Sequence, residues 1–153
     1  LVIAPHVVSD SHLKEILDKV KRPCIRYTEA TEENVTQADC LIIDCYGLLS
    51  SIYRYGEISY IGGGFGVGIH NVLEAAVYGI PVIFGPNNKK FREAQHLLEQ
   101  KGGFEVTGYD DFKRLMDKFL SDEAYLQQAG KAAGNYVNHN AGALEKIMKD
   151  ITL

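Results

Sequence analysis

The sequence has no long hydrophobic run, although apolar residues fill 46% of its 153 positions. A helix that crosses a bilayer needs about 18 to 20 consecutive apolar residues, and no stretch here approaches that length. The N-terminus also lacks the basic segment and apolar core of a secretion signal. We therefore expect these residues to be soluble. The opening Leu1-Val2-Ile3-Ala4-Pro5 has no initiator Met and indicates a piece of a longer protein.

Basic residues are not in excess either, and cysteines are few. Sixteen Lys and Arg stand against 20 Asp and Glu, giving a formal net charge of −4. Proteins that bind nucleic acid usually present a basic face, so nucleic acid is not an expected partner. Cys24, Cys40 and Cys45 are odd in number and lack C-x-x-C spacing. They lie in or beside apolar runs, which favours reduced buried thiols, and no metal site is predicted.

No internal repeat, low-complexity segment or linker interrupts the chain, so one domain is predicted over residues 1–153. Short apolar runs alternate with amphipathic stretches, which is typical of βαβ units that build a parallel sheet. The fold class is therefore predicted to be α/β, with a doubly wound, six-stranded parallel sheet of Rossmann type. The six strands are expected near Leu1–Ala4, Cys24–Tyr27, Cys40–Asp44, Ile58–Ile61, Pro81–Phe84 and Phe104–Val106.

Apolar residues at helical spacing predict helices that pack on this sheet. Two such sets are Leu13, Ile16, Leu17, Val20 and Phe112, Leu115, Met116, Phe119. The last part of the chain is expected to be a helical tail, with Ser121 as a helix cap and a closing apolar stripe of Leu144, Ile147, Met148 and Ile151. Doubly wound sheets bind ligands beyond the carboxyl ends of their strands, which points to the loops after Ala4, Asp44, Ile61 and Phe84.

A glycine-rich turn is the most informative stretch. Residues 62–68 hold five glycines in seven positions, each costing about 0.5–1 kcal/mol relative to Ala in regular structure. Glycine lets a backbone approach a ligand closely, and the helix expected next offers a seat for phosphate. The dinucleotide fingerprint G-x-G-x-x-G is not met, because its third glycine falls at Val67 or Ile69, and no Walker lysine follows. A mononucleotide site is the better hypothesis.

The helix expected after this turn places Asn71, Glu74 and Tyr78 on one face. The opposite, buried face is expected to hold Val72, Ala75, Ala76 and Gly79. Glu74 then points toward the glycine turn, where its carboxylate can accept two hydrogen bonds from the cis-diol of a ribose. The residues alone leave a second interpretation open, in which Glu74 only complements the helix dipole. His70 fits a helix cap or a packed histidine better than a catalytic base.

These motifs resemble those of the 3-deoxy-D-manno-octulosonic acid (Kdo) transferases, glycosyltransferases of the GT-B class. The donor domain of that family carries Gly-Gly-Ser/Gly-Phe, then Gly-Gly-His-Asn, then Leu-Glu. The corresponding residues here are Gly62–Phe65, Gly68-Ile69-His70-Asn71 and Leu73-Glu74. The similarity covers nearly the whole chain and continues through Gly79–Asn87, Phe91, Glu93 and Gly142-Ala143.

The resemblance implies that the chain is the C-terminal, CMP-Kdo-binding domain of an enzyme that transfers Kdo to a lipid A precursor in lipopolysaccharide biosynthesis. It implies donor contacts from Pro5, His6, Gly47, Leu48, Gly63, Gly64, Phe65, His70, Asn71, Val72, Leu73 and Glu74. The general base is expected in an N-terminal acceptor domain outside these residues, so no catalytic residue is assigned and the isolated domain is expected to be inactive. No cofactor or metal is implied. The full-length protein is expected to contact the cytoplasmic face of the bacterial inner membrane.

Three positions depart from the family pattern. His6 stands where the family has Arg, Leu48 where it has Glu, and Ile69 where it has Gly. Lys89, Lys90 and Arg92 either add positive charge toward the donor or acceptor, or form a solvated helix start. Two other functions remain open: a GT-B transferase or epimerase that uses a UDP-sugar, and a non-catalytic nucleotide-binding module.

Overall fold

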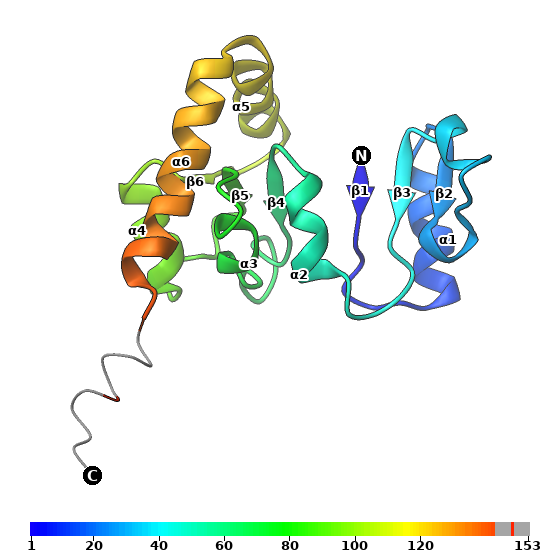
Figure 1. Cartoon of the computed structure of the whole chain (residues 1–153), viewed down its shortest axis with the longest axis horizontal. Helices are drawn as coiled ribbons and strands as arrows, with labels where there is room; N and C mark the ends of the chain where they lie inside the picture. Colours follow the sequence, from blue (N-terminus) through cyan, green and yellow to red (C-terminus); the bar gives the residue numbers. More distant parts are fainter. Residues whose placement is uncertain (143–147, 149–153) are drawn as a thin grey trace. The chain divides into compact units, whose positions relative to one another are not determined.

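The computed structural model describes residues 1–142 and Met148 and divides the chain into two compact units, Leu1–Ile52 and Tyr53–Leu153. The first unit contains β1 (Val2–Ile3), α1 (Asp10–Lys19), β2 (Cys24–Arg26), β3 (Cys40–Ile42) and α2 (Leu49–Ile52), with short 3₁₀ turns at Tyr27–Glu29 and Val35–Gln37 (Figure 1). The second contains a 3₁₀ turn at Tyr53–Tyr55, then β4 (Ser59–Ile61), α3 (Leu73–Ala76), β5 (Val82–Phe84), α4 (Arg92–Glu99), β6 (Gly103–Glu105), α5 (Tyr109–Ser121) and α6 (Glu123–Asn140).

The strands form two parallel sheets, ordered β1-β3-β2 in the first unit and β4-β5-β6 in the second. The α/β class and the six expected strands are confirmed, and each end lies within two residues of its expected place. The single six-stranded, doubly wound sheet is not confirmed, because backbone hydrogen bonds join the strands into two sheets of three. Apolar runs predict strands, whereas sheet number depends on long-range pairing that periodicity does not encode.

The first unit has its core between α1 and one face of its sheet. Ser9 caps α1, its hydroxyl accepting a hydrogen bond from the His12 N–H at 3.4 Å. The core consists of Leu13, Cys40 and Ile42, against which Ile3, Val8, Ile16, Val20 and Cys24 pack. The expected apolar face of this helix is thus confirmed at Leu13, Ile16 and Val20, while Leu17 is 36% exposed.

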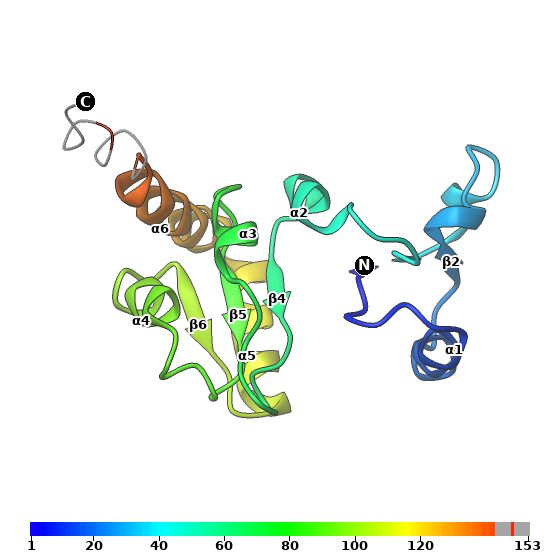
Figure 2. The same cartoon turned by 90° about the horizontal axis from the view of Figure 1, so that it is seen from below.

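The second unit has helices on both faces of its sheet, and Figure 2 shows α3 to α6 gathered around β4, β5 and β6. β5 is fully buried, with alternate side chains pointing to opposite faces. Val82 and Phe84 pack with residues of α3, α4 and α6. Ile83 packs on the other face with the apolar stripe of α5, which confirms that stripe, made up of Phe112, Leu115, Met116 and Phe119.

The prediction for Ser121 is wrong. Ser121 ends α5, and the cap of α6 is Asp122, whose Oδ1 accepts a hydrogen bond from the Tyr125 N–H at 2.9 Å. A carboxylate at the N-cap also complements the helix dipole. In the closing apolar stripe, Leu144, Ile147 and Ile151 lie outside the described residues, and Met148 is exposed. Over residues 1–142 and Met148, no helix has both the length and the apolar character needed to cross a membrane.

Candidate functional site

Two loops that carry predicted site residues begin at the same edge of the first sheet. Pro5 and His6 follow β1, and Gly47 and Leu48 follow β3. β1 and β3 are parallel neighbours, so their carboxyl ends meet at one edge, where ligands of such sheets bind. Pro5 and Leu48 are half-buried, and His6 and Gly47 are exposed.

Asp44 fixes the start of the loop that leads to Gly47. Its carboxylate accepts hydrogen bonds from the Thr28 N–H at 3.0 Å and the Thr28 hydroxyl at 2.5 Å. Burial raises the pKa of Asp44, but the hydrogen bonds from Thr28 and the charge of Arg26 outweigh burial, and the pKa lies below its ordinary value. Gly47 then turns the chain with φ +89°, in the left-handed region that glycine adopts readily.

In the second unit, the glycine-rich turn follows β4 and closes on itself. The Gly63 carbonyl accepts hydrogen bonds from the N–H groups of Gly66 at 2.9 Å and Gly68 at 3.3 Å. The Gly62 carbonyl accepts a hydrogen bond from the His70 N–H at 3.1 Å. Gly63 and Gly68 have φ of +88° and +145°, so both positions favour glycine for conformational reasons alone.

The turn also packs on the loop after β5, without room for a side chain. A Cβ atom added to Gly64 would lie 2.5 Å from the Gly85 nitrogen. Asn87 ties the two loops together: its N–H donates to the Gly64 carbonyl at 2.9 Å and its Nδ2 to the Gly66 carbonyl at 2.6 Å. Close packing between two loops therefore explains part of the glycine requirement of this turn without a ligand.

Helix α3 is much shorter than the sequence indicates. It has four residues, Leu73–Ala76, and no side-chain hydrogen bond at its N-cap Val72. The macrodipole sums over aligned peptide units, so one helical turn offers a phosphate little attraction. The predicted buried face is confirmed at Val72, Ala75 and Ala76. Gly79 is exposed, because the helix has already ended and the chain turns there with φ +69°.

Asn71 links the start of α3 to Glu74. Its Oδ1 accepts a hydrogen bond from the Leu73 N–H at 3.0 Å, and its Nδ2 donates to Glu74 Oε1 at 3.0 Å. Glu74 is half-buried. Tyr53 lies close by: burial raises the pKa of its phenol, and the charge of Glu74 raises it further. The Glu74 carboxylate is therefore held in place before any ligand arrives.

A cavity of about 360 Å³ opens beside this pair. Its lining combines apolar side chains with two polar ones and one carboxylate, from Ile69, His70, Asn71, Val72, Leu73, Phe91 and Glu93. The structure thus brings four predicted site residues, His70 to Leu73, around one cavity. Glu74 is not among the lining residues, but the Asn71 that holds it is.

Phe91 and Glu93 belong to the resemblance, but no binding role could be assigned to them from the sequence. The Phe91 ring packs on the glycine turn, where a Cβ atom on Gly68 would lie 2.9 Å from Phe91 Cζ. The Phe91 N–H donates to the carbonyl of buried Asn88 at 3.0 Å. Only the run Gly85-Pro86-Asn87-Asn88, typical of a tight turn, signals that the chain returns toward the glycine turn here.

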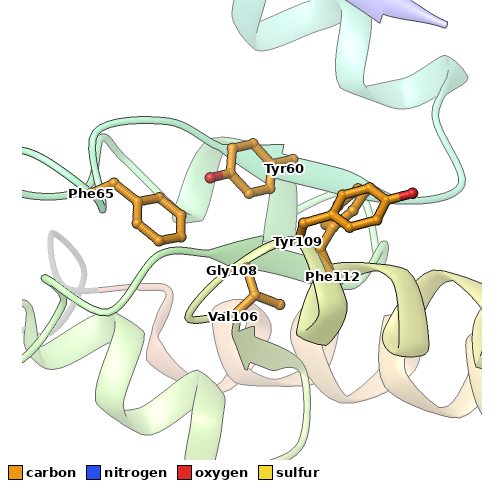
Figure 3. Close-up of a pocket in the computed structure, with 6 residues that line it drawn as sticks. All are labelled: Tyr60, Phe65, Val106, Gly108, Tyr109 and Phe112. Atoms are coloured by element: carbon orange, nitrogen blue, oxygen red, sulfur yellow. The ribbon is translucent and has the colours of Figure 1, made fainter.

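Phe65 lines a different cavity, of about 280 Å³. Figure 3 shows Phe65 on the glycine turn and Tyr60 on β4 near Val106, with Tyr109 and Phe112 of α5 on the other side. Phe65 is 56% exposed. This cavity is almost entirely apolar and contains no charged side chain, so it is a weaker candidate for a nucleotide phosphate.

Within the described part of the chain, no three His, Cys, Asp or Glu side chains are grouped as metal ligands would be. Lys89, Lys90 and Arg92 are exposed around the start of α4. Their exposure fits the solvated helix start better than a role inside the cavity, which they do not line.

The fold has a close counterpart among solved structures. The C-terminal CMP-Kdo binding domain of WaaA from Acinetobacter baumannii superimposes with a TM-score of 0.71, covering 89% of this chain and 72% of that one at 18% identity. A likeness at this identity establishes the fold. The chain therefore has the α/β fold of that C-terminal domain.

Sequence comparison finds relatives that are Kdo transferases. The chain is 37% identical over 87 residues to the Kdo transferase of Aquifex aeolicus, covering 56% of this chain. It is 28% identical over 149 residues to that of Rickettsia felis, covering 92%, and 29% identical over 117 residues to that of Chlamydia muridarum, covering 71%. No family model matches the chain. The resemblance to the Kdo transferases is confirmed, and the chain spans 25% to 31% of the length of these relatives.

Proposed function

We propose that these residues form the donor-binding domain of a Kdo transferase, which holds CMP-Kdo while Kdo is passed to a lipid A precursor. The observation that carries this proposal is the Asn71–Glu74 hydrogen bond beside the 360 Å³ cavity. Both residues lie on the stretch His70–Glu74 that matches the family motif. The names of the homologous enzymes supply the substrate class.

Glu74 is proposed to anchor the ribose. A carboxylate has about four acceptor positions, and the hydrogen bond from Asn71 to Oε1 occupies one of them. The two hydroxyls of a ribose can donate to the others. Because Asn71 fixes the carboxylate in advance, less side-chain freedom is lost when the ribose binds.

The glycine turn and the loops of the first unit are proposed to hold the rest of the donor. Backbone N–H groups of Gly63, Gly64 and Phe65 are suited to the negative charge that develops on the CMP leaving group. Pro5, His6, Gly47 and Leu48 are proposed to complete the nucleotide contacts. His6 replaces an arginine of the family pattern, so the planar guanidinium that arginine would offer to a phosphate is absent at this point.

The full-length enzyme is proposed to add an N-terminal acceptor domain that supplies the carboxylate base and meets the lipid A precursor at the cytoplasmic face of the inner membrane. Residues 1–153 then position the donor and stabilise the negative charge that develops on the CMP leaving group. A single six-stranded, doubly wound sheet stays a prediction for that protein.

Calorimetric titration of CMP, CMP-Kdo and UDP-sugars into residues 1–153 tests the donor class. CMP and CMP-Kdo are expected to bind, and UDP-sugars to bind more weakly. Kdo transfer to a lipid A precursor is expected from the full-length protein and not from residues 1–153 alone. Tighter binding of a UDP-sugar would support the epimerase or UDP-sugar transferase alternative instead, and turnover by these residues alone would place the base within them.

A further inference from the structure

Asn87, on the loop after β5, holds two carbonyl groups of the glycine turn. Its N–H donates to the Gly64 carbonyl at 2.9 Å, and its Nδ2 donates to the Gly66 carbonyl at 2.6 Å. Any residue except proline can make the main-chain hydrogen bond, whereas the second one needs a side-chain donor. The identity of residue 87 therefore decides whether the Gly66 carbonyl is held in this orientation.

These two hydrogen bonds also fix the direction of two N–H groups. A trans peptide group is planar, so its carbonyl and its N–H point in opposite directions, and all peptide bonds of the described residues are trans. The Gly64 carbonyl shares a peptide group with the Phe65 N–H, and the Gly66 carbonyl shares one with the Val67 N–H. Because both carbonyls point toward Asn87, both N–H groups point away from it.

The Phe65 and Val67 N–H groups are open to a ligand. Within residues 1–142 and Met148, no hydrogen bond uses either of them. Both residues are exposed, and the Val67 side chain projects fully into solvent at the tip of the turn. The turn therefore presents two main-chain donors whose direction is set by a residue of another loop.

The loop that carries Asn87 is itself anchored in the core of the second unit. The next residue, Asn88, is buried and points the other way. Its Nδ2 donates to the Gly85 carbonyl at 2.9 Å and to Glu105 Oε2 at 2.6 Å, and its Oδ1 accepts a hydrogen bond from Gln95 Nε2 at 2.6 Å. A shift of Asn87 would disturb this buried network, so its position is rigid.

This inference rests on the proposed function, in which N–H groups of the glycine turn bind the phosphate of the CMP leaving group. We propose that Asn87 is a positioning residue for that phosphate. It orients the Phe65 and Val67 N–H groups toward the ligand, while its own Nδ2 stays on the Gly66 carbonyl. Donors that are oriented before the anion arrives lose little freedom on binding and stabilise developing charge effectively.

A purely structural role for Asn87 predicts a different result. In that role, Asn87 would only join two loops that Gly64 and Gly85 already hold in contact. Its loss would then lower stability and affect every ligand of the site alike. A positioning role affects only ligands that carry a phosphate, so the ratio of the affinities for CMP and for cytidine separates the two roles.

The test titrates CMP and cytidine, which lacks the phosphate, into the chain and into Asn87→Ala. Asn140→Ala is the matched control, because Asn140 Nδ2 also donates to a main-chain carbonyl, that of Tyr136, at 2.8 Å. The wild type and the control are expected to prefer CMP over cytidine by the same factor. Asn87→Ala is expected to bind CMP about three- to tenfold more weakly, the usual effect of one hydrogen bond, and to bind cytidine as before.

Val67→Pro removes the second N–H directly. It is compared with Val67→Ala, which loses the same exposed side chain but keeps the N–H. Val67→Pro is expected to bind CMP about three- to tenfold more weakly than Val67→Ala. Adding Asn87→Ala to Val67→Pro is expected to cause little further loss, because the N–H that the Asn87 side chain orients is already absent.

An unchanged preference for CMP in Asn87→Ala, or an equal loss of CMP and cytidine binding, would overturn the positioning role and leave the proposed function intact. The same holds if Asn87→Ala has its full effect in the Val67→Pro background, because Asn87 would then act on the phosphate itself. The comparison of Asn87→Ala with Asn140→Ala decides the question if Val67→Pro does not fold. No binding of CMP to the wild type would overturn both proposals.

Discussion

The backbone of Gly64 is in direct contact with that of Gly85. A Cβ atom on Gly64 would lie 2.5 Å from the Gly85 nitrogen and 2.6 Å from its Cα, and the atoms it would meet are backbone atoms that cannot rotate away. The glycine turn after β4 and the loop after β5 are thus packed as one layer, against which the Phe91 ring also packs at Gly68.

Gly64→Ala is therefore expected to destabilise the second unit by about 1–3 kcal/mol or more, as overpacking does. Gly66→Ala is the matched control, because its Cβ would find its nearest neighbour, the Gly63 carbonyl oxygen, at 3.6 Å. Urea unfolding without ligand measures the difference. Equal stabilities of the two variants would show that the close contact is not required for folding.

Asn71→Ala is expected to cost about 0.5–1.5 kcal/mol of stability for each hydrogen bond lost, the usual net contribution of one such bond. It removes both the hydrogen bond to the Leu73 N–H and the one to Glu74. Asn71→Asp keeps the acceptor for Leu73 but places a second carboxylate against Glu74. We expect Asn71→Asp to fold better than Asn71→Ala yet to bind CMP at least as weakly. Thermal unfolding measures the stability of the two variants, and calorimetric titration measures their affinity for CMP. Tighter CMP binding by Asn71→Asp than by Asn71→Ala would contradict the prediction.

Much of the fold could be predicted from the sequence, because most of its strands lie in short apolar runs that are bounded by polar or turn residues. Val82-Ile83-Phe84 is such a run and is fully buried in β5. The apolar stripe of α5 could also be predicted, from the helical spacing of its apolar residues. The short length of α3 could not be predicted, because the helical pattern of the sequence continues to Tyr78, whereas the helix ends at Ala76 and the chain turns at Gly79. The number of sheets depends on pairing between distant strands.

In the candidate site too, local sequence motifs could be predicted, whereas contacts between distant segments could not. His70 to Glu74 could be found because they are contiguous and match a family motif. Glu93 could not, because it meets the cavity only through the packing of the loop after β5 on the glycine turn. The contact between Gly64 and Gly85 is likewise a three-dimensional one, and in the sequence both residues look like ligand-binding glycines.

Acid is expected to weaken the anchor between Asp44 and Thr28. The pKa of Asp44 is lowered in the folded chain, so its contribution to stability is present above the unfolded pKa, about 3.9, and is lost as the pH falls through the lower folded value. Thr28→Val, which removes the 2.5 Å hydroxyl hydrogen bond, should flatten this acid dependence. Urea unfolding between pH 2 and 6 measures it, with Ser51→Ala as an exposed hydroxyl control. An identical pH profile in Thr28→Val would contradict the assignment.

Cys40 is expected to be the least reactive of the three thiols. It is 1% exposed, and burial, with Cys24 nearby, raises the pKa of its thiol to about 11. The thiolate is the reacting form. In the Cys24→Ser/Cys45→Ser variant at pH 8, labelling of Cys40 by a disulfide reagent should be slow in the native chain and fast in urea. Rapid native labelling would show that the core of the first unit opens readily.

Glu74 as the ribose anchor is the central claim, and titration of CMP and 2′-deoxy-CMP into wild type and Glu74→Ala tests it most directly. A hydrogen bond to a charged group is worth about 1.5–3 kcal/mol, so the variant is expected to bind CMP about ten- to a hundredfold more weakly. The wild type should prefer CMP over 2′-deoxy-CMP, and the variant should lose most of that preference. Equal discrimination by both proteins would contradict the account, because Glu74 would then not contact the ribose.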